Sequence, residues 1–258
     1  MRAGAVVAVP TDTLYGLACS ASCSEALSAV YRIKGRNEIK PLAVCLGRVA
    51  DVYRYCHVRV PEGLLNDLLP GPVTLVMERS EELNKDLNPF TPLVGIRIPD
   101  HAFMQDLAQV FGGPLALTSA NLSSQASSLT VEEFQDLWPH LSLVIDGGPI
   151  GDGQSPKCRL GSTVVDLSVP GKFGIIRPGW IHQGFDEQSI GRWNSLECPG
   201  EHYSHPAEVW AVPLTLTLIL LLKLLRREGP RTGAGHYVSV FWWLARPHLQ
   251  RPLGLQCY

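Results

Sequence analysis

Short apolar runs alternate with helix-like segments through the first 180 residues, and this alternation limits the possible folds more than any other feature. Each run is bounded by turn residues and is too short for a helix, which predicts strands at residues 6–9, 41–46, 73–77, 94–98, 115–118, 143–145, 163–167 and 174–177. Strands separated by helices are typical of an α/β fold, whereas the close succession of strands after residue 140 favours antiparallel neighbours. The sequence therefore predicts an α/β fold with a twisted, mixed parallel and antiparallel sheet and flanking helices.

Helical periodicity predicts the segments that connect these strands. The first helix begins at a capping-box signature formed by Ser22 and Glu25 and ends at Gly35. Further helices are predicted at residues 63–69, 102–111 and 131–137, the last with a second capping box formed by Thr130 and Glu133.

The character of the chain changes after Gly179, which predicts a domain of residues 1–180 followed by an atypical tail of residues 181–258. The tail scatters Trp, His, Gly and Pro without a period, and we expect part of it to be poorly ordered. A leucine-rich run near residues 212–225 predicts a short apolar helix, shorter than the roughly 18 to 20 residues that span a bilayer. A buried or interfacial helix is therefore favoured, and peripheral membrane association of the tail stays open as an alternative.

Composition indicates a globular protein of a reducing compartment. The 258 residues carry a formal net charge of −2, so nucleic-acid binding would require a local basic surface. The seven cysteines are scattered and form no C-x-x-C pair, which argues against a disulfide framework or a zinc site. The N-terminal residues resemble neither a signal peptide nor a transit peptide, so we expect a cytoplasmic location.

The first candidate site follows the first predicted strand. Pro10 ends the apolar run there, and Thr11, Asp12 and Thr13 then present short polar groups. Open α/β sheets bind ligands at such strand ends. The same residues can instead form a self-capped turn, with Gly16 letting the backbone reverse. Both interpretations remain open for this segment alone.

A cluster of cations at the end of the first predicted helix is the second candidate. Arg32, Lys34, Arg36 and Lys40 precede the strand at residues 41–46. Cations near a helix C-terminus complement the helix dipole, so a purely structural role explains them. Alternatively, guanidinium and ammonium groups that converge on one loop can neutralise a triphosphate and stabilise a leaving pyrophosphate.

Polar side chains also follow or interrupt two later strands. Ser119 and Asn121 face the same side of an extended segment, where they can bond one ligand or only their own backbone. Arg97 lies inside an apolar strand, and a buried guanidinium there requires an anion, either a substrate carboxylate or an internal aspartate. His101 precedes a predicted helix and is more typical of a packing residue than of a base.

The last candidates are residues 161–163, which contain Ser162 and Thr163, and residues 177–179, which begin with Arg177. Each group lies at one end of a predicted strand, and both can line the same cleft. The sequence contains no Walker-type phosphate loop, no G-x-S-x-G elbow and no metal-ligand spacing of His and Cys. Chemistry by positioning and electrostatics is what these residues can support.

Six segments, taken in this order, resemble the YrdC/Sua5 family over about residues 4–180. They are residues 10–17 (Pro-Thr-Asp-Thr-Leu-Tyr-Gly-Leu), 34–36 (Lys-Gly-Arg), 97–101 (Arg-Ile-Pro-Asp-His), 119–121 (Ser-Ala-Asn), 161–163 (Gly-Ser-Thr) and 177–179 (Arg-Pro-Gly). The resemblance implies a YrdC-like twisted sheet with a large concave cleft. It also implies an L-threonylcarbamoyladenylate synthase, a nucleotidyltransferase that makes threonylcarbamoyl-AMP and pyrophosphate from L-threonine, bicarbonate or CO2, and ATP.

The resemblance also implies a role for each candidate residue. Residues that bind threonine or its carbamate would be Thr11, Thr13, Arg97, Ser162 and Thr163, with Arg97 on the carboxylate. Lys34 and Arg36 would be catalytic, and the residues that contact ATP would be Lys34, Arg36, Lys40, Ser119, Asn121 and Arg177. Magnesium would arrive with ATP, without dedicated protein ligands.

The implied partner of the product is a complex that transfers threonylcarbamoyl to adenosine 37 of tRNA. Direct contact with tRNA or double-stranded RNA is a further implication, and a non-catalytic RNA-binding module is the alternative function. The family also occurs in mitochondria. Three features depart from the family pattern: Cys45 stands where relatives have His, residues 123–128 are rich in serine, and both termini suggest a variant form.

Overall fold

The computed structural model of the 258-residue chain describes residues 4–151, 155–179 and 236–239. All of these residues belong to one compact unit of the chain. Apart from residues 236–239, the predicted tail, with its apolar helix near residues 212–225, lies outside the described residues.

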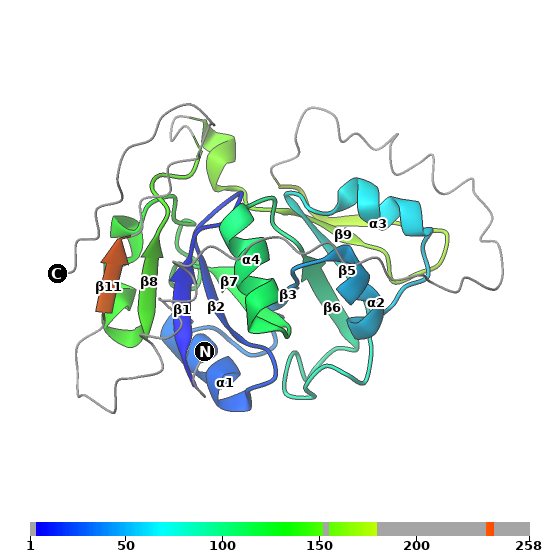
Figure 1. Cartoon of the computed structure of the whole chain (residues 1–258), viewed down its shortest axis with the longest axis horizontal. Helices are drawn as coiled ribbons and strands as arrows, with labels where there is room; N and C mark the ends of the chain where they lie inside the picture. The colour runs from blue at the N-terminus through cyan, green and yellow to red at the C-terminus, as the bar shows by residue number, and fades with distance from the viewer. Residues whose placement is uncertain (1–3, 152–154, 180–235, 240–258) are drawn as a thin grey trace. The chain divides into compact units, whose positions relative to one another are not determined.

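One mixed sheet forms the framework of this unit (Figure 1). The strands are β1 (Val6–Val9), β2 (Gly16–Ser20), β3 (Ala43–Cys45), β4 (Cys56–His57), β5 (Val73–Arg79), β6 (Leu93–Arg97), β7 (Leu115–Ser119), β8 (Leu143–Asp146), β9 (Thr163–Asp166), β10 (Gly174–Arg177) and β11 (His236–Ser239). Their order is β10-β9-β5-β6-β3-β7-β2-β1-β8-β11, with β4 paired to β5. Parallel pairing joins β1 to β8, β3 to β6, β5 to β9 and β8 to β11, and the other neighbours are antiparallel. The predicted mixed α/β sheet is confirmed.

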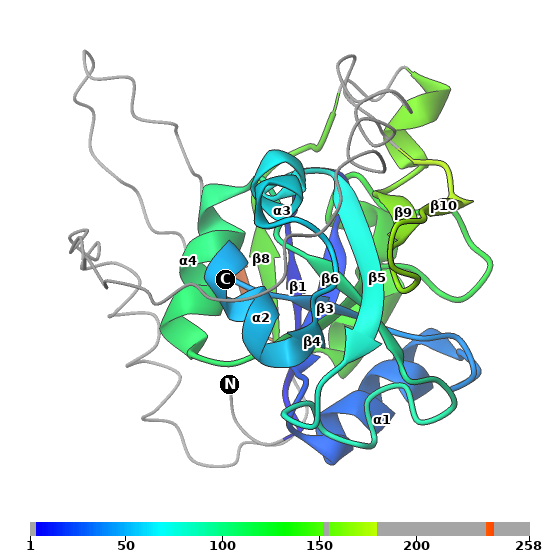
Figure 2. The same cartoon turned by 90° about the vertical axis from the view of Figure 1, so that its right-hand side faces the viewer.

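The helices are α1 (Ser24–Lys34), α2 (Val52–Tyr55), α3 (Glu62–Leu68) and α4 (Ala102–Phe111). Three 3-10 segments, Val49–Asp51, Glu132–His140 and Pro156–Arg159, complete the described elements. The two views show α1 and α4 on opposite faces of the sheet (Figures 1 and 2).

The main hydrophobic core lies on the sheet face that α1 covers. Val44, Ile96, Leu75 and Val165 are neighbours in register on β3, β6, β5 and β9, and each is 0% exposed. Leu27 of α1 belongs to the same core cluster. Burial of each such aliphatic side chain contributes about 1.5–3 kcal/mol, so this row ties four strands together.

Because side chains alternate along a strand, the residues next to this core row point to the sheet face opposite α1. Cys45, Thr74 and Arg97 each adjoin a member of the core row and therefore point away from α1. The same alternation that builds the core thus brings polar side chains of β5 and β6 to one surface.

The predicted capping boxes are wrong, although the first helix itself is confirmed. Cys23 is the N-cap residue of α1 and makes no side-chain cap, so Ser22 and Glu25 do not form the predicted box. Gly35 ends the helix in the left-handed conformation at φ 55°, as predicted.

The second predicted capping box fails because its helix is of a different kind. Residues Glu132–His140 form 3-10 turns interrupted at Phe134 rather than a regular α-helix. Glu133 accepts the backbone N–H of Leu129 at 3.1 Å and forms an ion pair with Arg159, so its carboxylate is used outside a capping box.

Gly16 begins strand β2 rather than a reverse turn, and the sequence did not predict this strand. Val9 pairs with Gly16 in the antiparallel β1–β2 ladder. A Cβ atom on Gly16 would lie 2.8 Å from the Leu117 side chain of β7. A side chain at this position would force the Leu117 side chain to shift, and the turn itself is made by the residues before Gly16.

Candidate functional site

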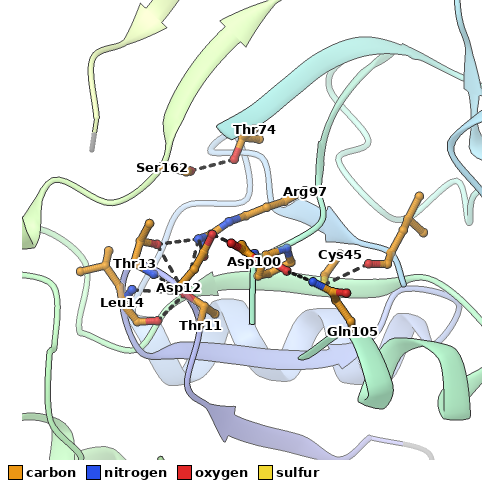
Figure 3. A network of polar contacts seen from close by, with 12 residues as sticks. Thr11, Asp12, Thr13, Leu14, Cys45, Thr74, Arg97, Asp100, Gln105 and Ser162 are labelled. Carbon is orange, nitrogen blue, oxygen red and sulfur yellow. Dashed lines mark hydrogen bonds and ion pairs between the residues drawn. The ribbon is translucent and has the colours of Figure 1, made fainter. Parts of the chain in front are cut away.

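Arg97 ends β6 and directs its guanidinium into the turn that follows β1 (Figure 3). Its Nη2 forms a buried ion pair with Asp12 and donates to Thr13 Oγ1 at 2.5 Å. The second carboxylate oxygen of Asp12 accepts the backbone N–H of Asp100 at 3.0 Å, which fixes its orientation. Of the two anions that a buried Arg97 could require, the structure places the internal aspartate beside it.

The turn at residues 11–14 is both self-capped and part of the site. Thr11 Oγ1 donates to the Leu14 carbonyl at 2.7 Å and accepts the backbone N–H groups of Thr13 and Leu14, each at 3.2 Å. Arg97 Nη2 lies 3.4 Å from the same oxygen. The two interpretations of this segment therefore coexist, because Thr11 shapes the turn while Thr13 contacts Arg97.

Lys34, the last residue of α1, is buried with 2% of its surface exposed. Its Nζ donates to the carbonyls of Ser119 at 2.5 Å and Asn121 at 2.6 Å. Burial, with a smaller contribution from the charge of Arg36, lowers the pKa of Lys34 to about 7. The ammonium group thus ties the end of α1 to the segment that follows β7.

Arg36 bonds only neutral acceptors within the described residues. Its Nη1 donates to Thr118 Oγ1 at 3.3 Å and its Nη2 to the Pro41 carbonyl at 3.0 Å. Burial lowers the pKa of Arg36, yet a guanidinium remains charged at neutral pH. Its charge is therefore available to an anionic ligand. Lys40, which was predicted beside it, is exposed.

Asn121 uses its side-chain amide to hold its own loop. Nδ2 donates to the carbonyls of Leu122 and Gln125, both at 2.8 Å, and Oδ1 lies 3.5 Å from Lys34 Nζ. Ser119 is partly buried at the end of β7, and its carbonyl rather than its hydroxyl contacts Lys34. Ser119 and Asn121, which were predicted to bind a ligand, thus belong to the segment after β7 that Lys34 stabilises.

Ser162 and Thr163, both predicted to bind threonine or its carbamate, lie on different sides of the sheet. Arg177 Nη2 donates to the Ser162 carbonyl at 2.8 Å, and the Ser162 hydroxyl is 2.8 Å from Thr74 Oγ1. Thr163 is 1% exposed and shares the core-facing side of β9 with Val165. Its hydroxyl is buried without a partner among the described residues. The structure therefore groups Ser162, and not Thr163, with Arg177.

Two guanidinium groups from distant segments lie close enough to Arg177 to affect its pKa. Burial lowers the pKa of Arg177, and the positive charges of Arg97 and then Arg36 lower it further. Like charges at such range are unfavourable until an anion joins them. The arrangement therefore suits a ligand with several negative charges, such as a polyphosphate.

His101 is the N-cap residue of α4 and packs edge-on against the Phe103 ring, at 6.4 Å between centroids. Burial lowers the pKa of His101, against a smaller opposing effect of Asp12 and Asp100. The imidazole is therefore neutral at neutral pH, in keeping with a packing residue.

Thr74 is a residue of this region that the sequence analysis missed. It is 6% exposed, contacts Ser162, and lies where a Cβ atom on Gly95 would meet its Cγ2 at 2.8 Å. The available signal was a single hydroxyl inside the apolar run of β5. Glycine at position 95 leaves room for this threonine to reach Ser162.

Within the described ranges, no three or more His, Cys, Asp and Glu side chains are grouped so that they could hold a metal ion. The helices of that same part of the chain are all too short or too polar to cross a bilayer.

Sequence comparison places this arrangement among known proteins. A family model described as "Sua5_yciO_yrdC: Telomere recombination" matches residues 1–179. The chain belongs to the Sua5/YciO/YrdC family. Over 179 residues this family member is 94% identical to a Bos taurus protein and 92% identical to a Homo sapiens protein, both named threonylcarbamoyl-AMP synthase. These matches cover 69% of this chain and 65% and 64% of the two relatives, so the chain spans slightly less than two thirds of their length.

Solved structures of the family share the fold. A double variant of Pyrococcus abyssi Sua5 matches with a TM-score of 0.63 and 28% identity, over 73% of this chain and 56% of that one. The P. abyssi Sua5 structure complexed with L-threonine matches with a TM-score of 0.63 and 23% identity, over 93% of this chain and 78% of that one.

Proposed function

We propose that the chain is a threonylcarbamoyl-AMP synthase, which converts L-threonine, bicarbonate or CO2, and ATP into threonylcarbamoyl-AMP and pyrophosphate. The observation that carries the proposal is the position of Arg177, which bonds Ser162 and is affected by the charges of Arg97 and Arg36, within a domain 94% identical to a bovine protein of that name. A reaction between anionic substrates that expels pyrophosphate needs this kind of cationic surface more than it needs a protein nucleophile.

The threonine end of the site is proposed at Arg97, Thr13 and Ser162. Arg97 uses Nη2 for Asp12 and Thr13, while its Nε has no partner among the described residues. An unpaired guanidinium N–H can donate to the carboxylate of an amino acid, and doing so satisfies a buried polar group. Asp12 holds the guanidinium in place for this contact.

The nucleotide end is proposed at Arg36 and Arg177. Arg36 Nε is also buried without a partner in the described part of the chain, and within that part the Arg177 guanidinium hydrogen-bonds to Ser162 alone. Both guanidiniums can therefore bind phosphate oxygens without first breaking an ion pair. The nucleotide would lie against the segment after β7, which contains Ser119 and Asn121 and is held by Lys34.

The proposed chemistry has two bond-forming steps. The neutral amine of threonine attacks CO2, which yields a carbamate and releases a proton. A carbamate oxygen then attacks the α-phosphorus of ATP, and the bond to the pyrophosphate leaving group breaks. Arg36 and Arg177 would stabilise the charge that develops on the phosphates, which is a preorganised electrostatic effect.

Magnesium belongs to the proposal as a companion of the ATP phosphates, where it would share their charge with the arginines. We further propose that the product passes to a tRNA threonylcarbamoyl-transfer complex and that the reaction occurs in the cytoplasm. The alternative, an RNA-binding module without catalysis, requires no synthesis at all, so one assay separates the two functions.

The assay measures pyrophosphate release by the full chain with threonine, bicarbonate, ATP and Mg2+, and with each component omitted in turn. The proposal expects release that depends on all of the substrates, together with threonylcarbamoyl-AMP detected by mass spectrometry. Arg36→Ala is expected to lower kcat/KM by roughly 100-fold, as loss of a preorganised donor does, without loss of folding. Release that does not need threonine would contradict the proposal.

A further inference from the structure

Asn88 lies on the connection between β5 and β6, yet only 2% of its surface is exposed. Its Oδ1 accepts the backbone N–H of Leu42 at 2.7 Å, and its Nδ2 donates to the Leu42 carbonyl at 2.9 Å. One side-chain amide thus satisfies both backbone polar groups of Leu42, as a neighbouring strand would. Because Leu42 directly precedes β3, Asn88 fixes the chain at the start of that strand.

The backbone of Asn88 has a left-handed conformation, at φ 52°. Most L-residues avoid this region, and asparagine tolerates it better than most. Glycine would adopt it with less strain. The presence of asparagine at this position is therefore explained by its side chain, whose two bonds to Leu42 glycine could not make.

The connection that carries Asn88 is itself anchored to the sheet. Arg79, at the end of β5, donates to the carbonyls of Leu83 at 2.8 Å and Asn84 at 2.5 Å, and also to that of Leu87. Leu87, the neighbour of Asn88, is 0% exposed. Asn88 therefore projects from a fixed platform toward Leu42.

The contact between Asn88 and Leu42 is connected to Arg36 through the neighbouring residue Pro41. Pro41, the neighbour of Leu42, accepts Arg36 Nη2 at 3.0 Å. Residues 37–41 are exposed, and the Tyr31 hydroxyl donates to the Lys40 carbonyl at 3.2 Å, so Pro41 lies between this contact and the buried Leu42. Without the amide of Asn88, the Pro41 carbonyl loses its restraint on the Leu42 side, and Arg36 loses a fixed acceptor.

We propose that Asn88 is a positioning residue which, through Leu42 and Pro41, holds Arg36 in the orientation that binds the triphosphate of ATP. The inference rests on the proposed function, since it concerns the nucleotide end of that site. Asn88 itself lies one residue and one hydrogen bond away from the acceptor of Arg36 and acts only through it.

The test replaces Asn88 in the full chain and measures steady-state kinetics for each substrate. Asn88→Gly keeps the left-handed backbone and removes both bonds to Leu42, so the KM for ATP should rise about tenfold, or about 1.4 kcal/mol. The KM for threonine should change by less than about twofold, and the Leu42 amide should exchange its hydrogen faster. Asn88→Asp retains the acceptor for Leu42 and should show a smaller rise.

A matched control exists on the same connection. Asn84 is partly buried, donates to Ser24 Oγ at 3.0 Å and accepts the backbone N–H of Asp86 at 3.0 Å, so its side chain bonds neither Leu42 nor Arg36. Asn84→Ala should leave the KM for ATP unchanged.

A double-mutant cycle tests whether Asn88 changes the KM for ATP by acting on Arg36. In the Arg36→Ala background, Asn88→Gly should change kcat/KM for ATP by less than about twofold, because coupled residues are not additive. A full tenfold loss in that background, or an equal rise of both KM values, would overturn the proposal.

The two proposals can fail separately. If the unaltered chain makes no threonylcarbamoyl-AMP, the proposed function falls, whereas ATP binding measured by calorimetry still tests Asn88. Asn88→Gly should then weaken ATP binding about tenfold while Asn84→Ala does not. Equal ATP affinity of Asn88→Gly and the unaltered chain would overturn the inference about Asn88.

Discussion

Asp12 and Arg97 bury two opposite charges at the end of β6, and each side chain is only 9% exposed. Removing one partner of such a pair leaves the other charge uncompensated, which typically costs about 3–5 kcal/mol. Asp12→Ala should therefore lower the free energy of unfolding by about that amount, as measured by urea denaturation.

The exposed pair of Arg48 and Asp51, at 3.1 Å, serves as the control for this prediction. Its side chains are 66% and 33% exposed, and Asp51→Ala should cost less than about 1 kcal/mol. Equal losses for the two aspartate variants would show that the Asp12 pair does not restrain Arg97 in the way described.

Lys34 should make stability depend on pH, because its pKa in the folded protein is about 7 and its unfolded value is near 10.5. Between these values the unfolded chain binds more protons, so stability should rise with pH by at most about 1.4 kcal/mol per unit. Below pH 7 both states are protonated, and the contribution no longer changes.

The measurement compares urea unfolding at pH 7.0 and 8.5 for the unaltered chain and for Lys34→Met. Other titrating groups affect both proteins, so the difference isolates Lys34. A gain of stability with pH that is smaller in Lys34→Met is expected. Identical pH slopes would mean that the carbonyls of Ser119 and Asn121 hold the ammonium fully charged.

Individual residues show where prediction from sequence ends. The apolar run around Arg97 was enough to predict a buried guanidinium that needs an anion. It could not decide between a ligand and Asp12, because these residues lie 85 positions apart and meet only in the folded sheet. Asn88 gave no signal at all, since its role depends on a backbone conformation and on Leu42.

At the scale of the elements, β9 and β10 depend on the absence of a side chain at Gly179. A Cβ atom there would lie 2.4 Å from the backbone of Ser162 and of Thr163, so Gly179→Ala must move the end of β10 away from β9. Arg177 would then lose its contact with Ser162. Small displacements of this kind can lower the catalytic rate by up to about 100-fold. We therefore expect kcat/KM of Gly179→Ala to fall by tenfold or more.

Gly174 provides the matched control at the other end of β10, where an added Cβ atom meets nothing within 4 Å. Gly174→Ala should change kcat/KM and stability little. If both alanine variants are equally active in the synthase assay, Arg177 does not need its present position.

Elements with strong apolar runs were predictable, and weakly patterned ones were not. Core strands such as β5 and β6 contain runs of apolar residues that the sequence shows directly. Strand β2 reads Gly-Leu-Ala-Cys-Ser, without β-branched residues, and follows a hydroxyl-rich turn, so its pairing with β1 and β7 arises from tertiary context. The capping boxes failed for a related reason, since Cys23 starts α1 without any side-chain cap.

At the scale of the whole molecule, the positions of the charged residues indicate an anion-binding site, whereas the net charge does not. The chain carries 22 lysines and arginines against 24 acidic residues, which gives no sign of an anion-binding site. The charges of Arg36 and Arg97 nevertheless affect the pKa of Arg177, because the sheet brings together segments far apart in the sequence. Only the resemblance to a family placed these three residues in one site before the structure did.

The proposal that this sheet carries a threonylcarbamoyl-AMP synthase is tested most directly by carbon-labelled bicarbonate. The full chain is incubated with labelled bicarbonate, L-threonine, ATP and Mg2+, and the nucleotide products are separated and counted. We predict label in a threonylcarbamoyl-AMP peak that matches the pyrophosphate released and is nearly absent with Arg36→Ala. An intact, folded chain that transfers no label to a nucleotide product would contradict the account.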